Sequence, residues 1–209
     1  MSILKRRRSF KLSDTFKQFA EIHKASLRGA DLSCIPEKYI NSKKLYDRFV
    51  PVMEAVRGYD LNKGVDFGCG VGAATVLGRL MGVEITGIDI PEYTTGPNPY
   101  SVVHQNLVKA GYPIKIFDTS QYPWDFAPNS FQFLLGFCAI GKDTSPNNVK
   151  DKDNMQQSDW VNDRLSELVR ITRRKGIWFL GPKATIAFVR GNKVFAKSPK
   201  TIILKEWPL

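Results

Sequence analysis

The sequence predicts an α/β fold in which helices precede a doubly wound, mostly parallel sheet that ends in an antiparallel hairpin. From residue 65 onward, short apolar runs alternate with amphipathic stretches, the pattern of strands joined by crossover helices. The run VDFGCGVG at 65–72 places three alternate glycines between a strand and a helix. Such a turn tolerates positive φ angles and lets a ligand lie against bare backbone. The fold class and a ligand-binding edge are therefore predicted together.

The 209 residues suit one domain with an extension at its N-terminus. We expect residues 1–57 to form a basic tail and a helical cap, and residues 58–209 to form the sheet domain. Two helices are expected in the cap, one from Ser13 or Asp14 to about Leu27 and one from Pro36 to Gly58. Pro51 should break or kink the second helix, because proline lacks a backbone N–H.

In the sheet domain, the strands are expected at 64–67, 83–89, 114–118, 131–137 and 177–181, and the helices at 72–81, 99–110 and 157–173. Residues 194–197 and 201–205 are expected to form the antiparallel hairpin. The polar stretch 141–159 follows the fourth strand, so it should lie at the carboxyl edge of the sheet, where doubly wound folds bind ligands.

Composition excludes several classes of protein. Three cysteines without a CxxC pair argue against a disulfide scaffold or a zinc site, so no metal is expected. There is no apolar run of 18 residues and no apolar leader, which points to a cytoplasmic protein. The net charge of +11 favours anionic partners, although a solvated basic surface explains it equally well. The one dense basic run, at 5–8, is expected to be a solvated tail.

The glycine turn alone leaves the ligand open, because residues 68–73 also satisfy the G-x-G-x-x-A dinucleotide fingerprint. Asp66 precedes the turn directly and would repel a pyrophosphate while attracting a cation. Asp89 ends the second strand, where a carboxylate can hold a ribose diol. The third strand is expected to end in Asp118 and Thr119, a polar pair placed to meet an adenine amino group. These residues favour a cationic nucleoside over a dinucleotide.

With these motifs in order, residues 58–181 resemble the class I S-adenosylmethionine-dependent methyltransferases of the type 11-like group, whose fold is Rossmann-like. The resemblance rests on VDFGCGVG, GIDI, FDTSQYPWDFAPNSFQFLLGFCAI and LSELVRITRRKGIWFL. It implies S-adenosylmethionine as cofactor, with Asp66 near its methionine amine and Asp89 on its ribose. The sequence departs from the family at Gln132, where an acid is frequent, and at residues 174–176, where Arg-Lys-Gly replaces a proline-glycine.

The predicted cofactor site also includes residues that shape the turn or face the cofactor. They are Gly68, Gly70 and Gly72 in the turn, Cys69 through its backbone, Ile90 on the adenine face, and Phe137 at the sulfonium end. Cys138 is not expected to be a nucleophile, because the proline that precedes such cysteines is absent. Five residues are candidates for binding the methyl acceptor: Tyr93, Tyr100, Tyr122, Trp124 and Lys142.

The sequence thus predicts a methyltransferase acting on a small, anionic metabolite or biosynthetic intermediate. Two alternatives stay open: a nucleic-acid or protein methyltransferase that uses the basic surface, and a cofactor-binding homologue without catalysis. No catalytic base is assigned. His23 is expected in the helical cap, and His104 is expected on a helix surface remote from the acceptor, so both are interpreted as structural or solvated.

Overall fold

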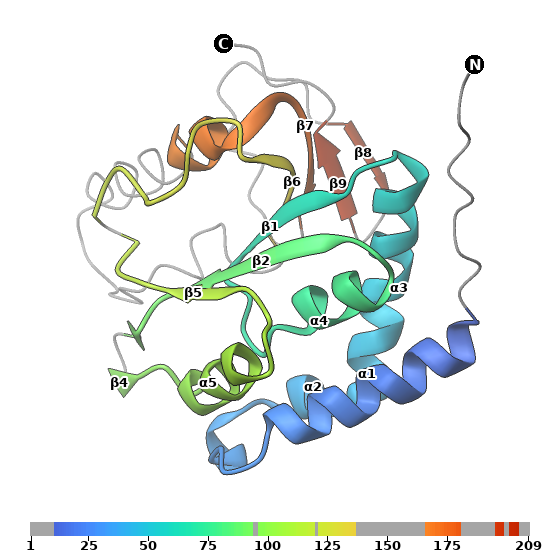
Figure 1. Ribbon diagram of the computed structural model, residues 1–209, viewed down its shortest axis with the longest axis vertical. Helices are drawn as coiled ribbons and strands as arrows, with labels where there is room; N and C mark the ends of the chain where they lie inside the picture. Colours follow the sequence, from blue (N-terminus) through green and yellow to red (C-terminus); the bar gives the residue numbers. More distant parts are fainter. Residues whose placement is uncertain are drawn as a thin grey trace.

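The computed structural model describes residues 11–93, 96–119, 121–136, 166–180, 195–198 and 201–204 (Figure 1). The helices are α1 (Leu12–Ser26), the 3-10 turn η1 (Leu32–Cys34), α2 (Glu37–Ile40), α3 (Ser42–Gly58), α4 (Ala73–Leu80) and α5 (Ser101–Lys109). A further helical stretch covers 166–171. The strands are β1 (Lys63–Phe67), β2 (Glu84–Asp89), β3 (Glu92–Tyr93), β4 (Gly96–Pro97), β5 (Ile114–Ile116), β6 (Phe131–Gly136), β7 (Thr172–Leu180), β8 (Phe195–Ser198) and β9 (Thr201–Leu204).

The N-terminal helices differ from the sequence prediction in three details. Helix α1 has Lys11 as its N-cap residue and no side-chain cap, so neither Ser13 nor Asp14 caps it. The second predicted helix is two helices, because Asn41 ends α2 and its side chain accepts a hydrogen bond from the Lys44 N–H to begin α3. Pro51 lies inside α3 without ending it. One missing N–H is tolerated there because the apolar face of α3 is buried in the core.

Seven strands form one sheet in the order β5-β2-β1-β6-β7-β9-β8. The first five pair in parallel, whereas β9 pairs antiparallel with both β7 and β8. The mostly parallel sheet and the C-terminal hairpin are as predicted. The chain leaves β1 toward β2 in one direction and reaches β6 on the other side of β1. This reversal makes the carboxyl end of β1 the switch point, where open α/β sheets bind ligands.

Helices α1, α3, α4 and α5 lie on one side of the sheet, and the stretch 166–171, in orange, lies on the other (Figure 1). One continuous apolar core joins α1, α3 and α4 to the sheet and includes Phe19, Met53, Leu77, Phe133 and Leu135. Side chains alternate along a strand, so the buried Leu134 faces the opposite layer. The N-terminal helices therefore share one core with the sheet.

At the C-terminal end, β7 begins at Thr172, so the helix predicted to run to residue 173 was extended too far. Thr172 pairs with Phe131 before an irregularity in the register, and this pairing draws the chain into the sheet early. Predicted residues 141–159 and the segment 184–189 lie outside the described residues, as does the basic run 5–8. Among the described helices, none is long and apolar enough to cross a membrane.

Candidate cofactor site

The glycine turn between β1 and α4 has the backbone that the sequence predicts. Gly68, Gly70 and Gly72 all have positive φ, at 70°, 52° and 67°. A Cβ added at Gly72 would lie 2.5 Å from Leu107, so this glycine is required for packing. A Cβ added at Gly70 would have only Tyr100 near it, at 3.9 Å. The backbone at Gly70 is therefore the part of the turn that a ligand can approach closely.

Asp89, at the end of β2, lies across from this turn and is 4% exposed. Its Oδ2 accepts a hydrogen bond of 2.9 Å from the Gly70 N–H, and its Oδ1 accepts one of 2.9 Å from the Ile90 N–H. The turn is also tied to β2 through the N–H groups of Gly68 and Cys69, which donate to the Ile88 carbonyl. The carboxylate predicted to hold a ribose is thus fixed in orientation next to the turn.

Asp66 occupies the penultimate position of β1, directly before the turn, and is also 4% exposed. Burial raises the pKa of Asp66 to about 7, and the negative charge of Asp89 acts in the same direction. The positive charge of Arg48 on α3 opposes them only in part. Two buried carboxylates therefore share one small region. A cation bound there would relieve their mutual repulsion.

His104 was predicted to lie on a helix surface remote from the acceptor, and the surface placement is wrong, because the side chain is buried beside the turn. Its side chain is 2% exposed and points from α5 to the turn, where Nε2 lies 2.5 Å from the Gly70 carbonyl oxygen. A carbonyl only accepts, so Nε2 carries the proton and the imidazole is the neutral Nε2–H tautomer. Nδ1 has no hydrogen-bond partner among the described residues. Burial lowers the pKa of His104 from its usual 6.5, although the Asp89 charge opposes the shift.

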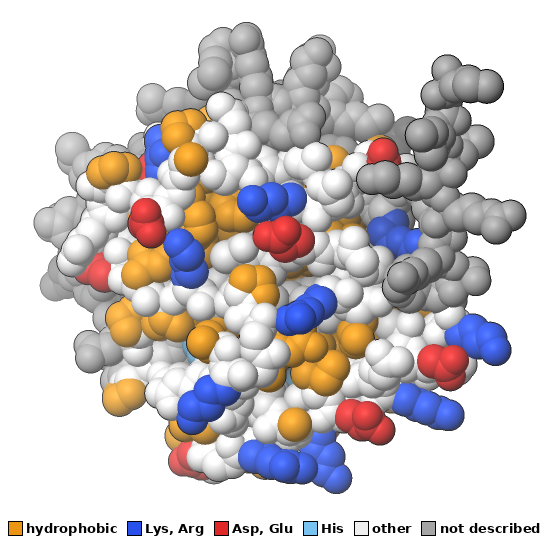
Figure 2. All heavy atoms as spheres, viewed as in Figure 1, with side chains coloured by type: hydrophobic (Ala, Val, Ile, Leu, Met, Phe, Trp, Pro, Cys, Tyr) orange, Lys and Arg blue, Asp and Glu red, His pale blue; other side chains and the backbone are white. Residues whose placement is uncertain are grey.

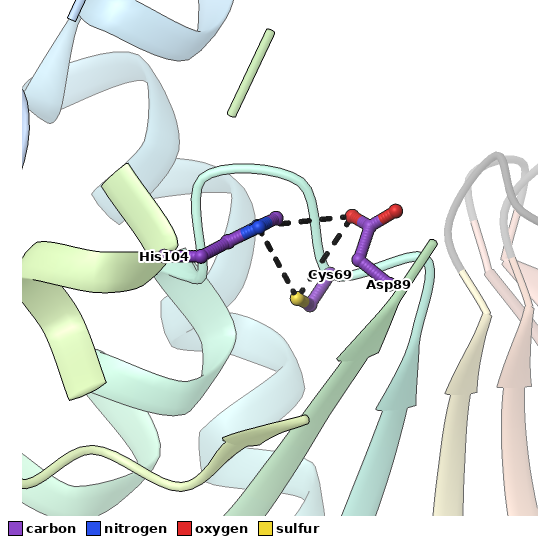
Figure 3. A group of neighbouring side chains, drawn as sticks. All are labelled: Cys69, Asp89 and His104. Carbon is purple, nitrogen blue, oxygen red and sulfur yellow. Dashed lines mark hydrogen bonds and ion pairs between the residues drawn. The ribbon is translucent and has the colours of Figure 1, made fainter. Parts of the chain in front are cut away.

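Cys69, Asp89 and His104 come together from the turn, β2 and α5 (Figure 3). The thiol lies 4.0 Å from the Asp89 Oδ2 and 3.9 Å from the His104 Nε2, which is itself 3.9 Å from that oxygen. Burial raises the pKa of the Cys69 thiol, so it stays protonated. Coordination of a metal through Nε2 would move the proton of His104 to Nδ1, which has no acceptor among the described residues. The cluster is therefore a poor fit to a metal ion.

Asn98 is a site residue that the sequence analysis missed. It is 2% exposed, and its amide donates to the Ile90 carbonyl at 2.6 Å and to the Asp89 Oδ1 at 3.4 Å. Its Oδ1 accepts from the Tyr100 N–H at 2.8 Å, which links the end of β2 to the start of α5. An asparagine two or three residues before a helix is typical of a turn that precedes a cap, so the sequence Asn-Pro-Tyr-Ser carried this signal.

β5 ends at Ile116, two residues earlier than predicted, so Asp118 and Thr119 follow the strand; Thr119 is buried whereas Asp118 is exposed. The segment after them is clamped from the other side of the sheet. Glu167 accepts a hydrogen bond of 2.7 Å from the Trp124 N–H, and Arg170 donates to the carbonyls of Trp124 and Phe126 while pairing with Glu167. Burial alone would raise the pKa of Glu167, but these hydrogen bonds hold it below its usual range.

The candidates for acceptor binding fall into three groups. Trp124 is 3% exposed and stacks on Phe67 with 5.5 Å between ring centroids, so it belongs to the core and not to a pocket wall. Tyr122 is exposed at 38% and stacks on Trp124 with 6.1 Å between ring centroids, whereas Tyr100 lies beside Gly70. The side chain of Tyr93 and all of Phe137, Cys138 and Lys142 lie outside the described residues.

The sheet order separates this fold from the dinucleotide-binding type. That type continues with a sixth parallel strand, whereas here the antiparallel hairpin of β8 and β9 closes the sheet. The glycine turn after β1 and the acid that ends β2 stand where the family resemblance implies. The chain therefore has a Rossmann-like, doubly wound α/β fold with a mostly parallel sheet and an antiparallel C-terminal hairpin.

Comparisons with known proteins are distant. A SAM-dependent methyltransferase from Aquifex aeolicus is 10% identical and has a TM-score of 0.45, over 94% of this chain and 100% of that one. The PH0226 protein from Pyrococcus horikoshii OT3 is 16% identical and has a TM-score of 0.49, over 83% and 81%. No family model and no curated protein matches the chain. Both TM-scores are below 0.5.

Proposed function

We propose that this protein binds S-adenosylmethionine and transfers its methyl group to a small, anionic acceptor. The observation that supports this function most strongly is the turn itself. Gly70 has an approachable backbone, with the buried carboxylate of Asp66 before it and that of Asp89 across from it. A ribose diol fits a fixed carboxylate, and a methionine amine fits a second one.

The same two carboxylates argue against a dinucleotide. A pyrophosphate on this turn would add negative charge beside two buried acids, where burial and then the Asp89 charge already raise the pKa of Asp66. S-adenosylmethionine instead carries a sulfonium and an ammonium group. Its positive charges would offset the cost of keeping Asp66 ionised in a buried place.

In methyl transfer the sulfonium supplies the reactive methyl group, and the protein contributes alignment and exclusion of water. Asp89 would orient the ribose, and Asp66 would anchor the amine end. The Gly70 backbone would let the cofactor lie close to the sheet edge. A protein base is required only for an acceptor that ionises poorly; Cys69 stays protonated, and the Nε2–H of His104 is engaged by the Gly70 carbonyl.

A small anionic acceptor suits the net charge of +11. On the face shown in Figure 2, the described Lys and Arg side chains are interspersed with Asp and Glu side chains. Nucleic-acid binding is favoured by a continuous basic stripe, and the described part of this face does not favour it. We therefore place a metabolite ahead of a nucleic acid as the acceptor.

Calorimetric titration with S-adenosylmethionine, S-adenosylhomocysteine and NAD tests the cofactor. The proposal expects micromolar binding of the first two and none of NAD. The variant Asp89→Ala should weaken that binding, whereas Asp47→Asn, at an exposed acid on α3, should leave it unchanged. Binding of NAD in place of the other two would refute the proposal. RNA binding that weakens steeply with salt would refute the choice of a small acceptor.

A further inference from the structure

The peptide groups of Gly70 are held on both sides by buried polar side chains. The Gly70 N–H donates to the Asp89 Oδ2 at 2.9 Å, and the Gly70 carbonyl accepts from the His104 Nε2 at 2.5 Å. Asp89 comes from β2, and His104 comes from the first half of α5. Neither hydrogen bond belongs to a regular helix or strand, so these two side chains set the conformation of the central residue of the turn.

From this geometry we infer that His104 is a positioning residue of the cofactor site. Its Nε2–H fixes the Gly70 carbonyl and so presents the turn in the conformation that receives the cofactor. The inference rests on the proposed function, because it assigns a purpose to a contact inside that site. His104 would thus act on the turn and not on the methyl acceptor.

The imidazole is itself held in place. The backbone N–H of His104 donates to the Tyr100 carbonyl at 2.8 Å, and the Tyr100 and His104 ring centroids lie 6.2 Å apart with 52° between the ring planes. Tyr39 of α2 packs edge-on against Tyr100 with 6.1 Å between centroids. A column of three rings therefore runs from the N-terminal helices to the turn, which gives those helices a route to the cofactor site.

A role limited to filling space is a weaker explanation of this histidine. Burying an imidazole leaves Nδ1 without a partner among the described residues, and a buried polar atom without a partner is costly. An apolar side chain of similar size would avoid that cost. What a leucine could not supply is the hydrogen bond to Gly70.

The test compares three variants by thermal unfolding and by calorimetric binding of S-adenosylhomocysteine. His104→Leu keeps the volume and removes the donor, and it should weaken binding about tenfold. His104→Gln restores a donor of similar reach and should recover binding to within about threefold of the wild type. Val103→Ala, which opens a cavity at a fully buried neighbour on α5, should lower the melting temperature yet leave the affinity within about twofold.

Unchanged affinity in His104→Leu would overturn the inference. So would a loss of affinity in all three variants in proportion to their loss of stability, because that pattern means a purely structural role. Failure of the wild type to bind the ligand would instead refute the proposed function, so the two failures are distinguishable.

A second measurement needs no ligand. The chain has two histidines, so the ring nitrogens of His104 can be assigned in long-range ¹H–¹⁵N spectra by comparison with His104→Gln. The inference expects the Nε2–H tautomer at neutral pH. An Nδ1–H tautomer would leave no donor for the Gly70 carbonyl and would overturn it.

Discussion

Replacing Asp66 by asparagine should stabilise the protein at alkaline pH while weakening its affinity for a cationic ligand. The carboxyl is 4% exposed, and burial together with the Asp89 charge raises its pKa to about 7, from 3.8 in an exposed carboxyl. Between these two pH values the folded protein binds a proton that the unfolded chain has released. The stability that this proton contributes is present below pH 3.8 and is lost as the pH rises through 7.

The size of the effect follows from those two pKa values. Compared with its value below pH 3.8, the free energy of unfolding is lowered by the titration of Asp66 by about 4 kcal/mol at pH 8 and about 1.5 kcal/mol at pH 5. Asparagine has nearly the same shape and does not titrate. The stability advantage of Asp66→Asn over the wild type should therefore grow by about 2.5 kcal/mol between pH 5 and pH 8.

Urea unfolding of both proteins at the two pH values measures this difference. Lowered pKa values at His23 and His104 make the folded state less stable as the pH falls below 6.5, but both histidines are present in each protein and cancel in the comparison. Asp47→Asn, at an exposed ion pair with Lys43, serves as the control and should show no such growth. An advantage of Asp66→Asn that is the same at pH 5 and pH 8 would refute the reasoning.

The remaining predictions concern the turn and the clamp behind it. Asp89→Ala should weaken binding of S-adenosylmethionine by about 1–3 kcal/mol with the fold retained, as measured by calorimetry; unchanged affinity would remove Asp89 from the site. Gly70→Ala should abolish binding at a stability cost of about 1–2 kcal/mol. Gly72→Ala should destabilise the protein more, because its Cβ would lie 2.5 Å from Leu107. Thermal unfolding compares the two variants, and equal losses of stability would contradict a packing role for Gly72. Arg170→Gln removes the donors to two backbone carbonyls and should destabilise the protein by about 2 kcal/mol, with an unchanged melting temperature as the contrary result.

The fold and the centre of the site could be predicted from sequence because both depend on local rules. Three alternate glycines between an apolar run and a helix have few conformations available, and all three have positive φ. Parallel strands end at the same edge of a sheet, so Asp89 at the end of β2 is expected to lie near the turn that follows β1.

What the sequence could not predict depends on how distant elements dock. The Asn106 amide donates hydrogen bonds to the carbonyls of Ser26, at the end of α1, and of Arg28. These contacts hold α5 in the orientation that buries His104. No spacing within α5 specifies that contact. Trp124 is a similar case, because only its stacking on Phe67 decides between core and pocket.

We propose that the turn between β1 and α4, with Asp66 and Asp89, forms the S-adenosylmethionine site. Backbone amide spectra recorded during titration with S-adenosylhomocysteine test it most directly. We expect the largest shifts at Gly68, Gly70 and Ile90, with saturation at micromolar ligand. Shifts confined to other amides, or no shifts at millimolar ligand, would mean that the turn is not the binding site.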